Sequence, residues 1–161
     1  MSTAITYVND KFNQGTMKED ASSVLLNNVN VQVTNPANPA GTTSTTLVQA
    51  GLGVTYTPKS TGRLLIIVTG EVNNNTANDG AQVKLVYGTG TAPANGAAAT
   101  GTAISPAYTV TESLASQNFP FTLISTVNLT VGTQYWFDLQ FAAVTGGTAS
   151  LSNITVTIIE L

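Results

Sequence analysis

Strict alternation along residues 133–141 constrains the fold of this chain more than any other feature of its sequence. In an extended backbone, apolar side chains would fill one face of this segment and a mostly polar set the other: Tyr135, Phe137, Leu139 and Phe141 against Gln134, Trp136, Asp138 and Gln140. The same period of two recurs at 29–33, 52–56, 83–87, 108–110, 119–123 and 154–158. Apolar residues never hold the helical period of 3.6, and Thr, Asn and Gly, all poor helix formers, recur throughout. The sequence therefore predicts an all-β fold.

Turn-forming residues separate these strands at regular intervals. Gly, Pro, Asn, Ser and Thr dominate 58–62, 73–80 and 145–148, and 88–101 consists almost wholly of small residues. Strands spaced about 8–12 residues apart, with turns between them, are typical of a sandwich or barrel. A chain of 161 residues is also long enough to bury a full hydrophobic core as one domain. We therefore expect an antiparallel jelly roll or β-sandwich of about eight to ten strands.

Charged residues are concentrated at the start of the chain, and this marks the clearest organisational boundary. The chain contains 5 Lys+Arg and 8 Asp+Glu, and the first twenty residues hold five of them: Asp10, Lys11, Lys18, Glu19 and Asp20. Apolar residues in the same stretch follow neither period. A cluster of Pro, Asn and Gly at 35–41 is typical of a linker. We predict an extended N-terminal arm and linker over residues 1–44 and one β-domain over residues 45–161.

Composition argues against several classes of partner and cofactor. The formal net charge is −3 with no basic stripe to neutralise phosphates, so we expect no nucleic-acid partner. The chain has no His and no Cys, which transition-metal sites favour, so neither a metal site nor a cofactor is expected. The longest apolar run, 64–68, is far too short to cross a bilayer, and we expect no membrane association.

Catalysis without His would need a pair of carboxylates, as in glycoside hydrolases. The candidates are Glu71, Asp79, Glu112 and Asp138, and no two of them stand at a diagnostic spacing. We interpret them as surface or hydrogen-bonded structural groups and expect a non-enzymatic protein. The sequence Asn78-Asp79-Gly80 is the nearest approach to a calcium loop, but a single Asp-Gly pair is more typical of a tight turn.

Trp136, the only tryptophan, lies on the opposite face of its strand from Tyr135 and Phe137. If the stripe that contains Tyr135 faces the core, the indole needs another cover, because a large aromatic ring left bare on a sheet favours association. The sequence leaves three interpretations open. The ring is covered by a neighbouring subunit, lies under a third layer formed by the N-terminal segment near 29–33, or serves as a platform on which a sugar stacks.

Two other segments are apolar on a second face. Residues 63–72 would place Leu64, Ile66 and Val68 on one side and Leu65 and Ile67 on the other. At the C-terminus, Ile159 and Leu161 lie opposite the face that carries Ile154, Val156 and Ile158. The second face of each segment therefore also needs a cover.

Four segments together resemble a domain common in virion proteins of tailed bacteriophages. They are Thr61–Gly70 (TGRLLIIVTG), Tyr87–Gly96 (YGTGTAPANG), Val131–Leu139 (VGTQYWFDL) and Ala143–Ala149 (AVTGGTA). The resemblance covers roughly residues 45–161. That domain is similar to C1q/TNF-type jelly rolls, generally assembles as a trimer, and occurs in capsid decoration (cement) proteins, head spikes and tail-fibre tips. The resemblance carries no catalytic residues.

The resemblance implies a homotrimer on the outer capsid surface of a virion, made in the host cytoplasm, with the major capsid protein or another virion protein as partner. The doubly apolar segments and the tryptophan would then meet around the threefold axis: Leu65, Ile67, Trp136, Ile159 and Leu161. Small apolar anchors in the arm would dock on the capsid: Ile5, Tyr7, Phe12, Val29, Val31 and Val33. The alternative is a receptor-binding head spike or tail-fibre tip that contacts a host glycan or protein through loops 73–80 and 88–101.

Overall fold

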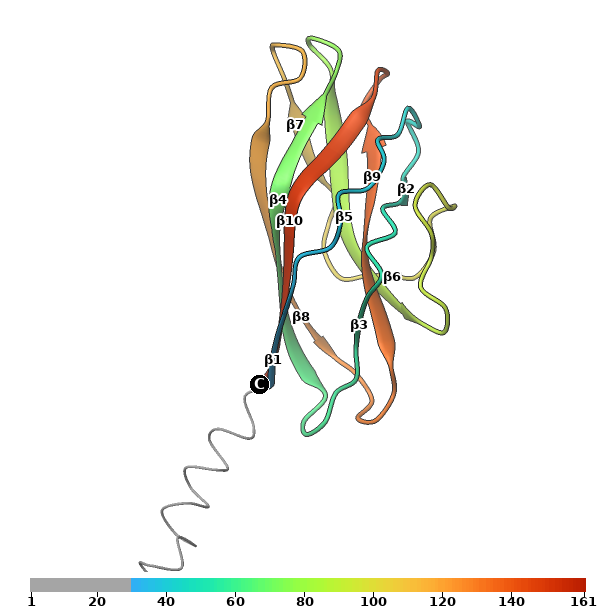
Figure 1. The fold of residues 1–161 in the computed structure, drawn as a ribbon, viewed down its shortest axis with the longest axis vertical. Coiled ribbons are helices and arrows are strands. Elements are labelled where there is room, and N and C mark those ends of the chain that lie inside the picture. Colours follow the sequence, from blue (N-terminus) through green and yellow to red (C-terminus); the bar gives the residue numbers. More distant parts are fainter. Residues whose placement is uncertain (1–29) are drawn as a thin grey trace, which may run out of the picture.

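Two antiparallel sheets face each other in this computed structural model, which describes residues 30–161 (Figure 1). The four-stranded sheet contains, in spatial order, β1 (Asn30–Thr34), β10 (Ala149–Glu160), β4 (Arg63–Asn74) and β8 (Phe119–Asn128). The second sheet has β9 (Tyr135–Ala143) and β5 (Gly80–Thr89) at its centre. The short strands β2 (Val48–Gln49) and β3 (Val54–Tyr56) pair with β9, and β6 (Thr102–Ala103) and β7 (Tyr108–Thr111) pair with β5.

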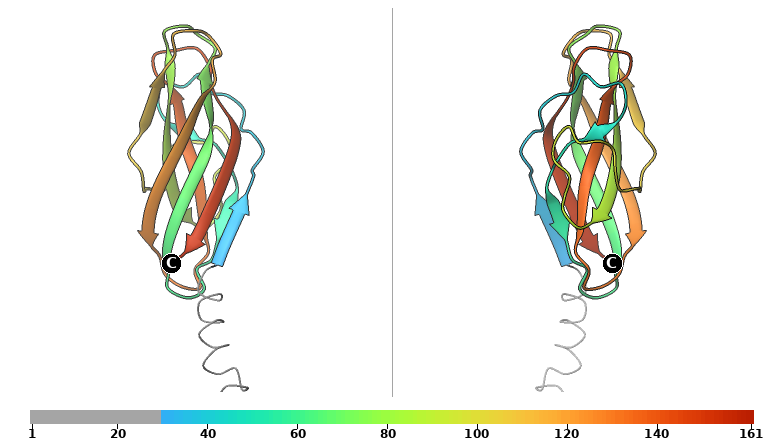
Figure 2. Two further views of the ribbon diagram at one scale, coloured as in Figure 1. Left: turned by 90° about the vertical axis from the view of Figure 1, so that its left-hand side faces the viewer. Right: turned by 90° about the vertical axis from the view of Figure 1, so that its right-hand side faces the viewer.

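The chain crosses between the two sheets repeatedly, as in a jelly roll. It passes from β4 in the first sheet to β5 in the second, and then from β8 to β9 and back to β10. The four-stranded sheet is seen face on in the left view of Figure 2. The predicted fold class is confirmed, with ten strands and no helix over residues 30–161. No helix in this part of the chain has the length and apolar character to cross a membrane.

The core is made by the alternating stripes that the sequence displays. The largest fully buried apolar side chains come from the central strands of both sheets: Leu64, Ile66, Leu85, Phe137, Leu139, Phe141 and Ile158. Each contributes about 1.5–3 kcal/mol by leaving water, so the facing stripes of β4, β10, β5 and β9 supply most of the driving force for folding.

The sandwich begins earlier in the chain than the predicted boundary at residue 45. Strand β1 pairs along its length with β10, from Asn30 opposite Glu160 to Thr34 opposite Val156. The segment 35–41, interpreted as a linker, is the crossover that follows β1 and rejoins β10 where Thr42 bridges Ala149. Two valines alternating with polar residues already have a strand pattern, and an isolated strand needs a partner for its backbone groups. The remainder of the predicted arm, residues 1–29, lies outside the described residues.

Candidate interaction surface

The outer face of the four-stranded sheet carries two rows of apolar side chains and threonines. Residues directly opposite one another in an antiparallel sheet point to the same face. The pairing register therefore builds one row from Val31, Ile159, Leu65 and Thr126, and a second from Val33, Thr157, Ile67 and Ile124. We call these eight side chains the outer apolar face.

Much of the outer apolar face is open to solvent. The exposed fractions of Val31, Val33 and Ile124 are 55%, 60% and 63%, and Leu65, Ile67 and Ile159 are half-buried. Neither row contains a charged residue, although alternate residues of each strand face solvent on this side of the sheet. Large contiguous apolar patches are typical of surfaces that associate with another molecule.

The structure brings together four of the five residues that the sequence suggested as subunit contacts. Leu65, Ile67 and Ile159 are neighbours in the two rows, and Leu161, which is 44% exposed, follows β10 and donates its N–H to the Arg63 carbonyl at 2.8 Å. Whether a subunit covers them stays a prediction.

Sequence reasoning missed part of this face. It assigned Val31 and Val33 to the docking arm, and they instead extend the outer apolar face from its edge strand β1. It did not single out Ile124. A signal was present, because the adjacent Leu123 and Ile124 make β8 apolar on both faces, as Leu64–Val68 does in β4. The other proposed arm anchors, Ile5, Tyr7, Phe12 and Val29, lie outside the described residues.

Trp136 lies apart from this face, in the second sheet, and its own chain covers it. Its exposed fraction is 4%, and its indole Nε1 donates a hydrogen bond to the Thr89 carbonyl at 3.1 Å. The ring packs against Gly88 and Gly101, where any side-chain carbon would overlap it. The premise that the ring needs a partner or the N-terminal segment as cover is therefore wrong, because segment 88–101 supplies that cover.

Segment 88–101 is fastened to the outer side of the second sheet through buried glutamines. The side-chain Nε2 atoms of Gln49 and Gln140 both donate to the Thr100 carbonyl, at 2.9 and 2.8 Å. The backbone of Gln49 also exchanges hydrogen bonds with this segment, accepting from Gly96 and donating to Ala97. The long small-residue loop is thus a third layer on the sheet, although many of its outward side chains remain exposed.

The four carboxylates weighed as catalytic candidates do not converge on one site. Glu71 lies on the outer side of the four-stranded sheet, where Asn118 and Asn153 donate to it. Asp138, in β9, is buried and accepts from the N–H groups of Gly51 and Leu52. Burial raises the pKa of Asp138, and these N–H groups only partly oppose it.

Asp79 and Glu112 are the two carboxylates that the fold places near each other, at the end of the sandwich where β4 turns into β5. The Glu112 N–H donates to the Asp79 carbonyl at 2.7 Å, and both residues are buried. Burial would raise the pKa of Asp79, but N–H groups, among them those of Thr145 and Gly80, lower it overall. No well-formed hydrogen bond reaches either carboxylate oxygen of Glu112, and its pKa is raised by burial and by the charge of Asp79.

A fifth carboxylate, Glu160, was not singled out in the sequence, and it organises the opposite end of the sandwich. Its two oxygens accept hydrogen bonds from four consecutive backbone N–H groups of the turn between β3 and β4, at 2.8–3.0 Å: Lys59, Ser60, Thr61 and Gly62. Burial alone would raise the pKa of Glu160, but these donors outweigh it and lower the pKa to about 2. Burial and the Glu160 charge raise the pKa of the neighbouring Tyr56 to about 12.

The position of Glu160 carried a signal in the sequence. It continues the inward stripe of Ile154, Val156 and Ile158, and a charged residue in such a stripe must find partners. Among residues 30–161, no three His, Cys, Asp or Glu side chains lie close enough to hold a metal ion.

Comparison with solved structures finds the same sandwich in virus particles. A chain in the structure of the Gx strain of infectious bursal disease virus superposes with a TM-score of 0.51 at 10% identity, over 81% of this chain and 33% of that one. A chain of the T13 particle of the same virus gives a TM-score of 0.52 at 8% identity, over 82% and 31%. The present chain spans about a third of the length of either. At such low identity the likeness establishes the fold alone.

Sequence comparison adds no relative to these structural likenesses. No protein-family model matches the chain, and no curated protein does.

Proposed function

We propose that this chain is a non-enzymatic structural protein of a virion, a trimeric capsid decoration protein that stabilises the shell from its outer surface. The observation that carries the proposal is the outer apolar face. Two uncharged rows across four strands are the kind of surface that a neighbouring subunit buries, and three of their side chains are more than half exposed in the single chain.

Two further features support a structural role. Four of the five carboxylates among residues 30–161 are buried, and three of these accept hydrogen bonds from backbone N–H groups that fasten turns or neighbouring strands. The fold is also one that virus particles use, since two of the similar chains belong to infectious bursal disease virus. The bacteriophage domain that segments of this sequence resemble assembles as a trimer on virions.

The chain enters the sandwich beside the outer apolar face. Asn30 opens β1 at the end of the molecule where the C-terminus also lies, and Val31 is the next residue (Figure 1). In the proposal, residues 1–29 bind the major capsid protein, with Ile5, Tyr7 and Phe12 as apolar anchors. Residues Val31 and Val33 belong to the face between subunits.

A receptor-binding spike is the alternative, and one observation favours it. Loop 73–80 presents exposed residues at one end of the sandwich, and the tip of segment 88–101 is exposed as well. In that case the two loops would contact a host glycan or protein. Neither loop contains an aromatic residue or an arginine, the side chains that dominate binding hot spots.

Two changes to the chain separate the proposed roles of the face and the arm. Ile124→Asp places a charge at the most exposed apolar position of the face, so trimers seen by light scattering should become monomers with an unchanged circular dichroism spectrum. Leu114→Asp, on an exposed loop residue away from the face, is the matched control and should leave the trimer intact. A chain that lacks residues 1–29 should still form trimers and should no longer bind capsids stripped of this protein.

Several results would contradict the proposal. A full chain that is monomeric at micromolar concentration, or trimers that survive Ile124→Asp, would overturn the role of the face. Capsid binding that persists without residues 1–29 would overturn the role of the arm. The number of copies per purified virion decides between decoration and spike, because a decoration protein approaches the copy number of the capsid subunit and a spike is present as a few trimers.

A further inference from the structure

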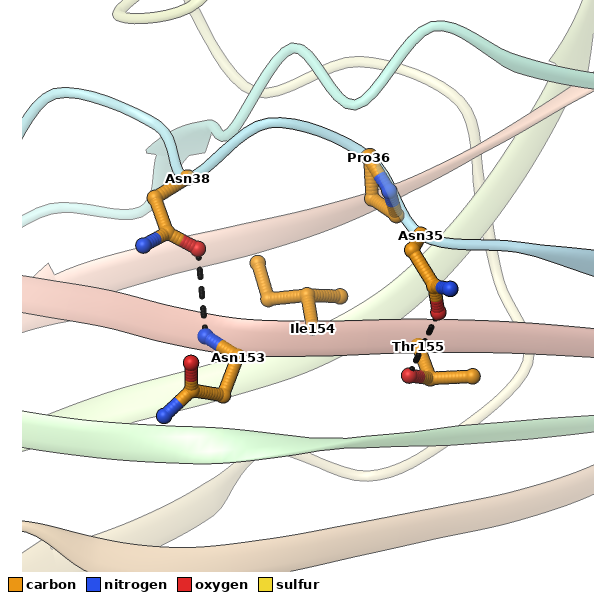
Figure 3. Close-up of a pocket in the computed structure, with 6 residues that line it drawn as sticks. All are labelled: Asn35, Pro36, Asn38, Asn153, Ile154 and Thr155. Atoms are coloured by element: carbon orange, nitrogen blue, oxygen red, sulfur yellow. Dashed lines mark hydrogen bonds between the residues drawn. The ribbon is translucent and has the colours of Figure 1, made fainter.

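A pocket opens beside β10 where the crossover after β1 leaves the sheet. Backbone pairing stops after Thr34 opposite Val156 and resumes only at the bridge between Thr42 and Ala149. The gap between these two points is a pocket of about 410 Å³ lined by Asn35, Pro36, Asn38, Asn153, Ile154 and Thr155 (Figure 3). Its volume lies within the range of small-molecule sites.

The β10 side of the pocket is a bulge with an unusual backbone. The register between β10 and β4 shifts between Ser152 and Thr155, and Asn153 within the shift has φ of 53°. Asparagine adopts this left-handed conformation more readily than most residues other than glycine, because its short polar side chain can hydrogen-bond locally. Bulges redirect side chains and often lie beside binding sites. Here the bulge turns the Asn153 N–H away from the ladder and toward the crossover.

Side-chain amides replace the missing strand pairing. The Asn38 Oδ1 accepts from the Asn153 N–H at 3.1 Å, and the Asn35 Oδ1 accepts from the Thr155 hydroxyl at 2.8 Å (Figure 3). The side-chain oxygen of each asparagine therefore accepts a hydrogen bond, whereas its NH₂ group has no partner within the described residues. Within residues 30–161, the Nδ2 atoms of Asn35 and Asn38 and the Oδ1 atom of Asn153 make no hydrogen bond. Two donors and one acceptor are thus fixed in place and available to a ligand.

Hydrogen bonds from asparagine side chains connect the pocket to a surface carboxylate. Asn153 Nδ2 donates to Glu71 Oε2 at 3.0 Å, and Asn118 Nδ2 donates to the same oxygen at 3.2 Å. Glu71 is the one carboxylate in the described part of the chain that is not buried, since Asp79, Glu112, Asp138 and Glu160 all are. Its other oxygen makes no hydrogen bond there and is a strong acceptor next to Asn153.

From this arrangement we propose that the pocket binds a neutral saccharide. Sugar hydroxyls both donate and accept, which matches the amide NH₂ groups at the two ends of the pocket and the amide oxygen of Asn153 (Figure 3). Pro36, which is half-buried, gives a small apolar surface between the two asparagines, against which the C–H face of a sugar ring can lie. The negative Glu71 accepts a hydrogen bond from Asn153, which lines the pocket, so an anionic ligand would be repelled. This inference goes beyond the proposed structural role and does not depend on it.

The test uses the full chain and free sugars followed by amide chemical shifts. Glucose, galactose, mannose and N-acetylglucosamine serve as neutral probes, and N-acetylneuraminic acid as the anionic one. At least one neutral sugar should shift the Asn153 N–H and the NH₂ signals of Asn35 and Asn38 at millimolar concentration. Asn153→Gly removes the amide but keeps a backbone that suits positive φ, so it should fold and bind at least about tenfold more weakly.

Ser116→Gly is the matched control, because Ser116 also has positive φ, at 59°, but lies in the loop between β7 and β8, away from the pocket. It should bind the sugar like the unaltered chain. Asn35→Ala, at an exposed residue, gives a second loss of binding that does not depend on the bulge. The proposal is overturned if none of the four neutral sugars shifts these signals, if Asn153→Gly binds like the unaltered chain, or if the anionic sugar binds most tightly.

Discussion

Replacing Glu160 with Gln tests how strongly one buried carboxylate holds the end of the sandwich together. Gln has nearly the same shape, but it lacks the charge and turns an NH₂ group toward backbone donors that already point at this site. The change therefore removes the charge and one of the two acceptor oxygens without leaving a cavity, so that at least one of the four N–H groups, such as that of Lys59, faces an NH₂ group instead. Unsatisfied buried donors cost about 1–3 kcal/mol each, and more when the lost acceptor is charged.

The magnitude follows from the pKa of Glu160. A fall from 4.5 to about 2 corresponds to roughly 3 kcal/mol of preference for the ionised form in the folded state, at about 1.4 kcal/mol per pKa unit. Because Lys59 and Ser60 in the turn are exposed, solvent screens part of this electrostatic preference. We therefore expect Glu160→Gln to lower the free energy of unfolding by about 2 kcal/mol at about pH 7.

The stability deficit of Glu160→Gln should depend on pH, and the direction of the pKa shift fixes how. The folded-state pKa is depressed, so the contribution of Glu160 is complete above its ordinary pKa of 4.5 and is lost as the pH falls from there toward about 2. Urea unfolding followed by Trp136 fluorescence should show a deficit in the variant that shrinks as the pH falls through this window. A deficit below about 0.5 kcal/mol at about pH 7, or one that does not change with pH, would refute this account.

Two further substitutions test other buried contacts by the same unfolding measurement. Gly101→Ala should destabilise the fold by about 2 kcal/mol more than Gly90→Ala, because both positions have positive φ but only at Gly101 would the added carbon overlap Trp136. Equal destabilisation by the two substitutions would mean that the Trp136 ring moves aside without an energetic cost. Asp138→Asn should cost less than Glu160→Gln at about pH 7, since burial raises the pKa of Asp138 and penalises its charge. A raised pKa gives stability that is lost as the pH rises, so the deficit of this variant should shrink from about pH 4 to about pH 7, and a growing deficit would contradict the assignment.

Local patterns were sufficient to predict the fold class. The alternation in β9 and the turn residues between strands indicated a sandwich of about eight to ten strands, because a period of two is fixed by the backbone of any single strand. The same patterns found most of the outer apolar face, since Leu65, Ile67 and Ile159 each lie opposite an inward stripe of their own strand. Val31 and Val33 joined that face only once β1 was seen to pair with β10 across more than 120 residues of sequence.

Sequence alone determined that this chain builds a sandwich of half-buried strands with apolar residues left over on a second face. Only the tertiary structure decided what covers each of those residues. Trp136 and Ile124 stand on outward faces alike, yet segment 88–101 folds back over the indole and nothing in the described chain covers Ile124. The pocket at Asn153 depends likewise on where the crossover leaves β10. Periodicity reports the face on which a side chain stands, whereas its cover depends on contacts between segments far apart in the sequence, which no local pattern encodes.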